Sequence, residues 1–163
     1  MARLTIRHIQ AMKDNDQPIT MLTAYDLTSA RLAEKAEIPM LLVGDTLGMV
    51  IQGHDSTIPV TLDHMLYHCA IVARVTEHAF IVGDLPFMTY QISPAQAMQS
   101  AARLMQEGGV SAVKLEGGAS IAPTIRRITE AGIPVMAHIG LTPQRVTAVT
   151  PAVKARAMAT PPP

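Results

Sequence analysis

The sequence has 163 residues and a formal net charge of +0, with 48% hydrophobic and 16% charged residues. This composition is typical of a soluble globular protein, and the length is sufficient for one domain with a substantial core. A balanced charge and only 3% aromatic residues argue against nucleic-acid binding, which depends on a basic surface or on stacking platforms. Cys69 is the only cysteine, so an internal disulfide is excluded and a reducing compartment is expected.

The amino-terminal segment, MARLTIRHIQAMKDND, lacks the apolar core of a signal peptide. No apolar run in the sequence approaches the length that spans a membrane. We therefore expect a cytoplasmic protein that does not contact a membrane.

Helices and short apolar strands alternate along the chain. The predicted helices are Leu4–Lys13, Thr28–Glu37, Leu62–Thr76, Ser93–Gln106 and Ser120–Ala131, and the predicted strands are Thr20–Ala24, Met40–Val43, Phe80–Val82, Ala112–Leu115 and Val135–Ala137. The apolar runs are short and end at glycine or an acid, which is typical of buried parallel strands. The first helix is expected to cover the bottom of a barrel.

The helix that begins at Ser93 has the clearest boundaries. Ser93 is a candidate N-cap, Pro94 occupies the first helical position and Gln96 completes an S-x-x-Q capping box. Gly108 and Gly109 end the helix. Cys69 lies on the apolar stripe of the preceding helix and is expected in the core.

The repeated strand–helix order predicts an α/β protein with a parallel sheet. Polar residues follow several of the strands, as they do at the active face of a TIM (β/α)8 barrel. Five strand–helix units are recognisable, whereas such a barrel has eight strands and typically about 250 residues. We therefore expect a partial barrel domain over residues 1–144.

The carboxyl-terminal segment Arg145–Pro163 has a different character. It contains no Asp or Glu, is rich in Ala and Pro, and has neither helical nor strand periodicity. We predict that residues 145–163 form a disordered tail outside the domain.

Three carboxylates follow three different strands: Asp45, Asp84 and Glu116. Hard oxygen ligands on a rigid face suit Mg²⁺, and the His and Cys content of a zinc site is absent. Lys114 lies two residues before Glu116, so both side chains are expected on one face of a strand. This set predicts metal-assisted carbanion chemistry on a small acid, in which the ammonium pairs a substrate carboxylate.

Each of these residues also has a plainer interpretation. An acid after a strand is often a helix cap or turn residue, and three acids together with Lys114 favour the site. His138 could bind substrate or satisfy a backbone group, and Tyr25 could line the pocket or pack beneath it. The glycines form neither G-x-G-x-x-G nor a P-loop, so a nucleotide site is unsupported.

Five segments of the sequence are distinctive: TAYD (Thr23–Asp26), LVGDTLGMVIQGHDSTIPVT (Leu42–Thr61), DLPFMTY (Asp84–Tyr90), VKLEGG (Val113–Gly118) and HIGLTPQ (His138–Gln144). Together they resemble the ketopantoate hydroxymethyltransferase family. The likeness runs in order from about Ile6 to Gln144, and the long block around GHDST is its most specific part.

The resemblance implies a TIM barrel that binds Mg²⁺ and transfers a one-carbon unit from 5,10-methylenetetrahydrofolate to 3-methyl-2-oxobutanoate, giving 2-dehydropantoate for pantothenate biosynthesis. It implies Asp45, Asp84 and Glu116 as metal ligands and a large homo-oligomer, often a decamer. The implied oxoacid-binding residues are Asp45, Thr46, Asp84, Lys114, His138 and Tyr25. Thr46 stands where the family commonly has serine.

The resemblance also implies segments that this sequence lacks. After Gln144 the family continues with three more strands and a glutamate that acts as the general base, so we expect a carboxyl-terminally truncated member whose catalytic base is unknown. Two alternatives remain open. One is a 2-oxoacid lyase or mutase of the related barrel superfamily, and the other is a non-catalytic fragment that docks on full-length subunits.

Overall fold

The computed structural model describes residues 3–144, which form one parallel sheet with helices packed against it. The strands are β1 (Met21–Thr23), β2 (Met40–Val43), β3 (Phe80–Asp84), β4 (Ala112–Glu116) and β5 (Val135–His138), and they lie in the order β1-β2-β3-β4-β5. Every neighbouring pair is parallel. The predicted α/β class and parallel sheet are therefore confirmed.

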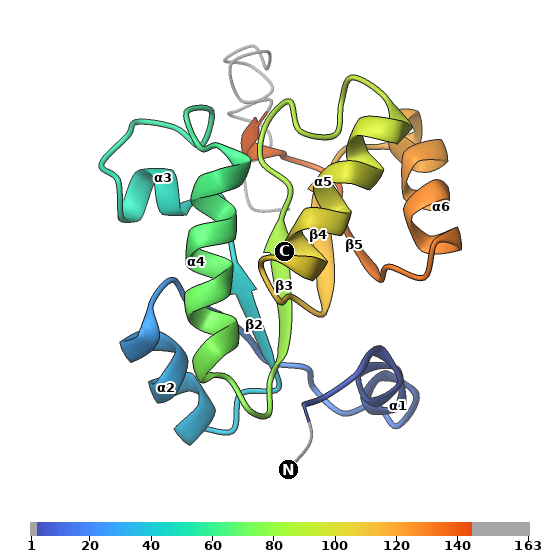
Figure 1. Ribbon diagram of the computed structural model, residues 1–163. Coiled ribbons are helices and arrows are strands. Elements are labelled where there is room, and N and C mark those ends of the chain that lie inside the picture. The colour runs from blue at the N-terminus through green and yellow to red at the C-terminus, as the bar shows by residue number, and fades with distance from the viewer. Residues whose placement is uncertain (1–2, 145–163) are drawn as a thin grey trace, which may run out of the picture.

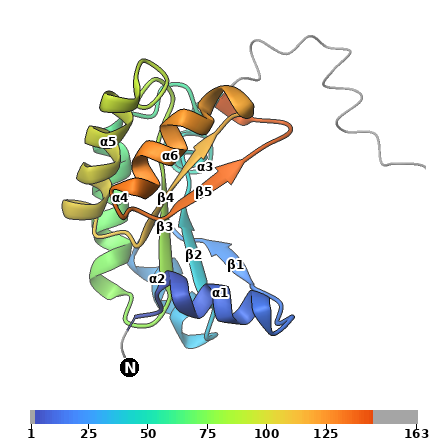
Figure 2. The ribbon, with the colours of Figure 1, turned by 90° about the vertical axis from the view of Figure 1, so that its right-hand side faces the viewer.

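The helices are α1 (Ile6–Asp14), α2 (Leu27–Lys35), α3 (Leu47–Val50), α4 (Leu62–Val75), α5 (Pro94–Gln106) and α6 (Ala122–Glu130), with a 3-10 turn η1 (Ala119–Ile121) before α6. The one-turn helix α3 was not predicted. Figure 1 shows α4, α5 and α6 in front of the strands, and the side view in Figure 2 shows them as one layer on that face of the sheet.

Apolar side chains on both faces of the sheet make two cores. The larger core lies between the strands and the helices and includes Leu41, Ile81 and Val113, all fully buried. The smaller core joins Met40 and Phe80 at the amino ends of β2 and β3, with side chains around α1 packed on it. The first helix therefore lies at the amino ends of the strands (Figure 2), as the sequence predicted for the bottom of a barrel.

Side-chain caps fix the starts of three helices. The Asp26 carboxylate accepts the Ser29 N–H at 2.7 Å at the start of α2, and Thr61 accepts the His64 N–H at the start of α4. Ser93 caps α5 as predicted. The predicted capping box is wrong in its second half, because Gln96 Oε1 accepts the N–H of Ile92 instead of that of Ser93.

The edges of the sheet differ from the sequence prediction of buried strands. All three residues of β1 are exposed and β5 is only half-buried, whereas every residue of β3 is buried. The reason is that β1 and β5 are the edge strands, so each has a hydrogen-bonded neighbour on one side only.

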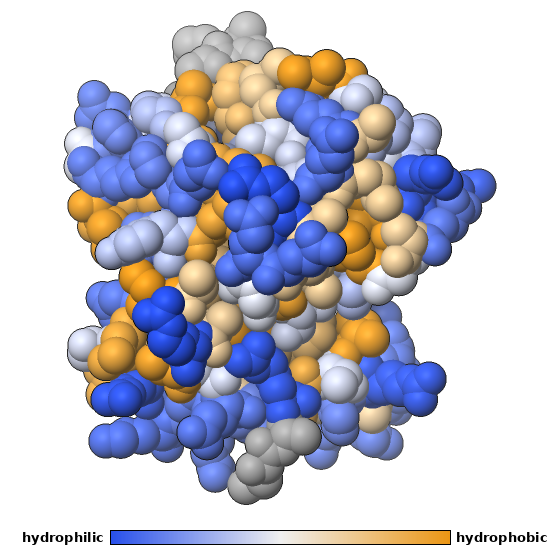
Figure 3. All heavy atoms as spheres, in the orientation of Figure 1, coloured by the Kyte–Doolittle hydropathy of each residue, from blue (hydrophilic) through white to orange (hydrophobic). Residues whose placement is uncertain are grey.

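The helix-covered face is largely polar, with apolar patches among the polar side chains (Figure 3).

Within the described part of the chain, no helix combines the length and apolar character needed to cross a membrane. Cys69 is buried, as predicted. The predicted tail over 145–163 lies outside the described residues.

Candidate active site at the carboxyl ends of the strands

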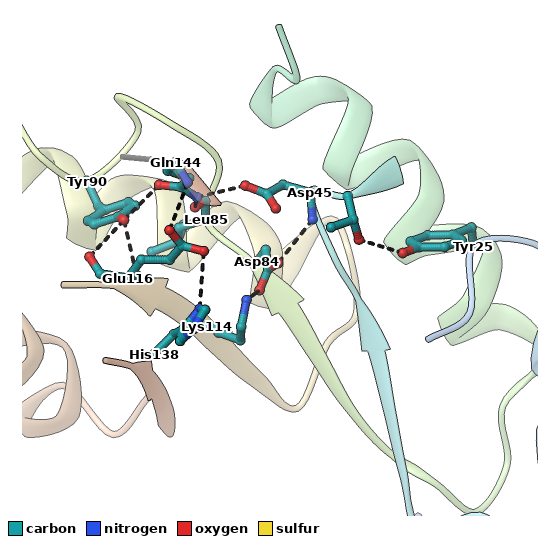
Figure 4. Close-up of polar contacts among 10 residues, drawn as sticks. Tyr25, Asp45, Asp84, Leu85, Tyr90, Lys114, Glu116, His138 and Gln144 are labelled. Atoms are coloured by element: carbon teal, nitrogen blue, oxygen red, sulfur yellow. Dashed lines mark hydrogen bonds and ion pairs between the residues drawn. The ribbon is translucent and has the colours of Figure 1, made fainter. Parts of the chain in front are cut away.

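The register of the sheet brings four predicted site residues together in two pairs. Asp84 and Lys114 are direct partners across β3 and β4, and Glu116 and His138 are direct partners across β4 and β5. Lys114 Nζ donates to Asp84 Oδ1 at 2.5 Å, and His138 Nδ1 lies 3.3 Å from Glu116 Oε1 (Figure 4). Lys114 and Glu116 point to the same face of β4, as their spacing predicted.

Asp45 joins this group from the loop after β2. Its backbone N–H donates to Asp84 Oδ2 at 3.0 Å. Gly44 leaves room for the Thr46 side chain, because a Cβ there would lie only 3.0 Å from Thr46 Oγ1. Asp45, Asp84 and Glu116 are all almost fully buried. The loop therefore places a second buried acid beside Asp84.

The electrostatic state of these acids follows from their burial. Burial and the negative charge of Asp84 together raise the pKa of Asp45 to about 6, against the opposing effect of the hydrogen bond from Gln144. Burial also raises the pKa of Asp84, against the opposing effect of the Lys114 ammonium. Lys114 balances one of these negative charges, so the site retains excess negative charge when the acids are ionised.

Gln144 crosses the site and contacts two of the acids. Its Nε2 donates to Asp45 Oδ2 at 2.8 Å and to the Leu85 carbonyl at 3.0 Å, and its backbone N–H donates to Glu116 Oε2 at 3.0 Å. The Tyr90 hydroxyl lies 2.8 Å from Gln144 Oε1 and accepts the backbone N–H of Glu116. Sequence reasoning gave no role to Gln144 or Tyr90, although both end motifs that carry the family likeness.

Tyr25 and Thr46 form a separate pair at the other side of the site. The Tyr25 hydroxyl and Thr46 Oγ1 are 2.7 Å apart, and the backbone carbonyl of Tyr25 contacts His68 Nδ1 at 2.7 Å. Figure 4 shows Tyr25 on the opposite side of Asp45 from Glu116 and His138, with its hydroxyl directed toward the site. Tyr25 therefore orients the Thr46 hydroxyl next to Asp45.

The donor chemistry of the three acids suits Mg²⁺, because buried carboxylate oxygens with excess negative charge are its preferred protein ligands. Within residues 3–144, however, no group of three or more His, Cys, Asp or Glu side chains is already arranged around one metal position. Hydrogen bonds from Gln144 and the ion pair with Lys114 occupy some of the carboxylate oxygens instead. The ligand set thus fits the ion in type and charge, and its side chains would have to adjust to bind it.

Comparison with known proteins agrees with the segments described above. A family model described as ketopantoate hydroxymethyltransferase matches residues 3–160. A 3-methyl-2-oxobutanoate hydroxymethyltransferase from Chloroflexus aurantiacus is 60% identical over 147 residues, which cover 90% of this chain and 52% of the relative. The enzyme of the same name from Gluconacetobacter diazotrophicus is 61% identical over 142 residues, which cover 87% of this chain and 51% of the relative. The chain therefore spans about half the length of these relatives.

Solved structures share the fold at low sequence identity. A 2,3-dimethylmalate lyase of the PEP mutase/isocitrate lyase superfamily superposes with a TM-score of 0.66 at 20% identity, covering 84% of this chain and 53% of that one. A phosphoenolpyruvate phosphomutase from Streptomyces platensis superposes with a TM-score of 0.65 at 18% identity, and the match covers 82% of this chain and 53% of that one. The extent of the family match and the identity to its curated members lead to one conclusion: this chain belongs to the ketopantoate hydroxymethyltransferase family.

Proposed function

We propose that this chain carries the oxoacid- and metal-binding part of a hydroxymethyltransferase. The proposed reaction transfers a one-carbon unit from 5,10-methylenetetrahydrofolate to C3 of 3-methyl-2-oxobutanoate and gives 2-dehydropantoate. The observation that carries the proposal is the convergence of Asp45, Asp84, Lys114 and Glu116 at the carboxyl ends of three neighbouring strands, in a chain of this family.

The proposed roles follow from the donors and acceptors at the site. Lys114 has three N–H donors and uses one for Asp84, so its ammonium can also pair the carboxylate of the oxoacid. The Thr46 hydroxyl, oriented by Tyr25, and the half-buried ring of His138 supply further hydrogen bonds to the oxoacid. These groups would orient the C3–H bond for proton removal.

Asp45, Asp84 and Glu116 would hold Mg²⁺, which when bound supplies Lewis-acid polarisation of the keto oxygen and so acidifies C3. Removal of the C3 proton also needs a base. The family resemblance implies a glutamate that follows the part matching Gln144, and we propose that this residue belongs to the rest of a (β/α)8 barrel of which this chain supplies five units. Assembly into a homo-oligomer is part of the same proposal.

The test is exchange of the C3 proton of 3-methyl-2-oxobutanoate in D₂O, followed by NMR with the purified chain and Mg²⁺ in imidazole buffer. We expect exchange above the rate measured without protein in the same imidazole buffer, because this chain supplies the proposed metal and oxoacid site and the buffer imidazole takes the place of the glutamate base. Asp84→Asn should abolish the effect, whereas Asp63→Asn, at an exposed surface ion pair with Arg103, should leave it unchanged.

Two results would count against the proposal. Exchange that is equal in wild type and Asp84→Asn would show that the carboxylate site does not act on the oxoacid. Absence of exchange with this chain, under conditions in which the Chloroflexus aurantiacus relative is active, would leave the activity with the longer protein. Co-purification of this chain with that relative would then favour a docking fragment.

A further inference from the structure

Gln144 is buried at the centre of the acid cluster and is held on both sides of its amide. It is 2% exposed, and its Nε2 bridges the Asp45 carboxylate and the Leu85 carbonyl. Its Oε1 accepts from Gln91 Nε2 at 3.2 Å and lies 2.8 Å from the Tyr90 hydroxyl. The side chain therefore uses both of its amide hydrogens and its carbonyl oxygen within the protein.

The orientation of the amide follows from the chemistry of its partners. A backbone carbonyl such as that of Leu85 only accepts hydrogen bonds, so the nitrogen of the amide must face it. The same orientation directs the second N–H to Asp45 Oδ2 and leaves the oxygen facing Tyr90 and Gln91. If the amide were rotated, its oxygen would face the Leu85 carbonyl and the Asp45 carboxylate, which are themselves acceptors, and both hydrogen bonds would be lost.

The contacts of Gln144 leave one oxygen of Asp45 available. The amide binds Oδ2 of Asp45, and Figure 4 shows the second carboxylate oxygen turned toward Asp84. The backbone N–H of Gln144 binds Oε2 of Glu116, whose other oxygen faces His138. One residue thus fixes the carboxylate of the loop after β2 and the carboxylate at the end of β4 relative to each other.

We propose that Gln144 is a positioning residue for the cation of this site, and that its amide and backbone N–H hold Asp45 and Glu116 so that Asp45 and Asp84 face one metal position. This inference rests on the proposed metal-dependent function. Anchoring of the amide on Leu85 and Tyr90 favours a role in which Gln144 stays in place when the cation binds. The opposite role, in which Gln144 is a plug that the cation must displace, is an outcome of the test.

The test is the dissociation constant for Mn²⁺, a spectroscopically visible substitute for Mg²⁺, measured by electron paramagnetic resonance of the unbound ion with the whole chain. Gln144→Met keeps the length of the side chain and removes its hydrogen bonds. We expect binding to weaken about 10–100-fold, the range for loss of a group that orients metal ligands. Gln96→Met is the matched control, because the Gln96 amide contacts backbone groups of Met88 and Ile92 in the β3–α5 loop. Mn²⁺ binding by this control variant should equal that of wild type.

The outcomes separate this inference from the proposed function. Equal Mn²⁺ binding by wild type and Gln144→Met would overturn the positioning role, and tighter binding by the variant would overturn it in favour of a plug. If wild type binds no Mn²⁺, both the metal site of the proposed function and this inference fail. Oxoacid exchange that persists in wild type while Gln144→Met binds Mn²⁺ normally would overturn the role of Gln144 alone.

A second measurement applies if Gln144→Met does not fold. In wild-type protein with ¹⁵N-labelled glutamine, the side-chain amide protons of Gln144 should exchange slowly with solvent, and they should remain protected when Mg²⁺ is added. Protection that is lost on addition of Mg²⁺ would show that the amide leaves Asp45, which overturns the proposal.

Discussion

Lys114 and Asp84 form a buried ion pair in which Nζ lies 2.5 Å from Oδ1 and the two side chains are only 14% and 4% exposed. The pair joins β3 to β4 at the point where the register makes these residues direct partners. Asp84 also accepts the backbone N–H of Asp45, so one carboxylate links three consecutive strand ends.

Removal of the cation from this pair should destabilise the fold. Lys114→Met leaves the Asp84 charge buried without its partner, which typically costs about 3–5 kcal/mol of unfolding free energy. We expect this loss in urea titrations near pH 7. The double variant Lys114→Met/Asp84→Asn should recover most of it, because the amide still accepts the Asp45 N–H without a charge. Equal stability of the single variant and wild type would mean that solvent screens the pair.

Asp45 should make stability depend on pH in the direction opposite to an ordinary surface carboxylate. Its pKa is raised from 3.8 to about 6 in the folded state, mainly by burial, so folding favours the protonated form. This stabilisation is fully present below a pH of about 4 and is lost as the pH rises through about 6. In the absence of divalent metal, Asp45→Asn should therefore gain stability over wild type between pH 4 and 7, by at most about 3 kcal/mol.

The measurement for Asp45 is the difference in unfolding free energy between wild type and variant at several pH values. Asp63→Asn serves as the control, because the Asp63 side chain is 79% exposed. A difference for Asp45→Asn that does not change with pH would contradict the raised pKa.

Glu34 should contribute stability through three backbone hydrogen bonds. Its carboxylate accepts the N–H groups of Glu77, His78 and Ala79, at 3.0, 3.0 and 2.8 Å, and so ties α2 to the start of β3. Burial acts to raise the pKa of Glu34, but these hydrogen bonds outweigh it and lower the pKa below 4.5. Glu34→Gln should cost about 1.5–3 kcal/mol near pH 7, as expected for bonds to a charged acceptor.

The contribution of Glu34 should be lost at low pH. A lowered pKa means that the stabilisation is present above pH 4.5 and disappears as the pH falls through the folded-state pKa. The unfolding free energies of Glu34→Gln and wild type should therefore converge in acid. Glu37→Gln, at an exposed position after the same helix, should match wild type throughout. If Glu34→Gln were as stable as wild type at pH 7, the three backbone hydrogen bonds to the Glu34 carboxylate would not contribute the predicted stability.

Cys69 should be unreactive in the folded protein. Burial, with a smaller effect of the negative charge of Asp84, raises the pKa of its thiol to about 12. Since the thiolate is the reactive form, labelling by a chromogenic disulfide reagent should require unfolding. The labelling rate should rise with denaturant in parallel with the loss of helical circular dichroism. Rapid stoichiometric labelling without denaturant would show that α4 opens in the native state.

Sequence alone determined the class of fold and most of the element boundaries. The reason is local: apolar runs that stop at Gly44-Asp45 or Glu116-Gly117 are typical of buried parallel strands, and Ser93 with Pro94 specifies a helix start. The motif segments also identified the family, because their residues occur in a fixed order that few proteins share. The metal and oxoacid roles of Asp45, Asp84, Lys114 and Glu116 remain predictions.

Only the tertiary structure decided which of these residues meet. The pairing of Asp84 with Lys114 and of Glu116 with His138 depends on strand register, which is set by packing across the whole sheet and not by any local pattern. The exposure of β1 likewise follows from its place at an edge. Gln144 is 99 residues from Asp45 along the chain, and it reaches that carboxylate because the chain after β5 returns over the ends of β2, β3 and β4. A contact between residues so distant in sequence exists only once the sheet has formed.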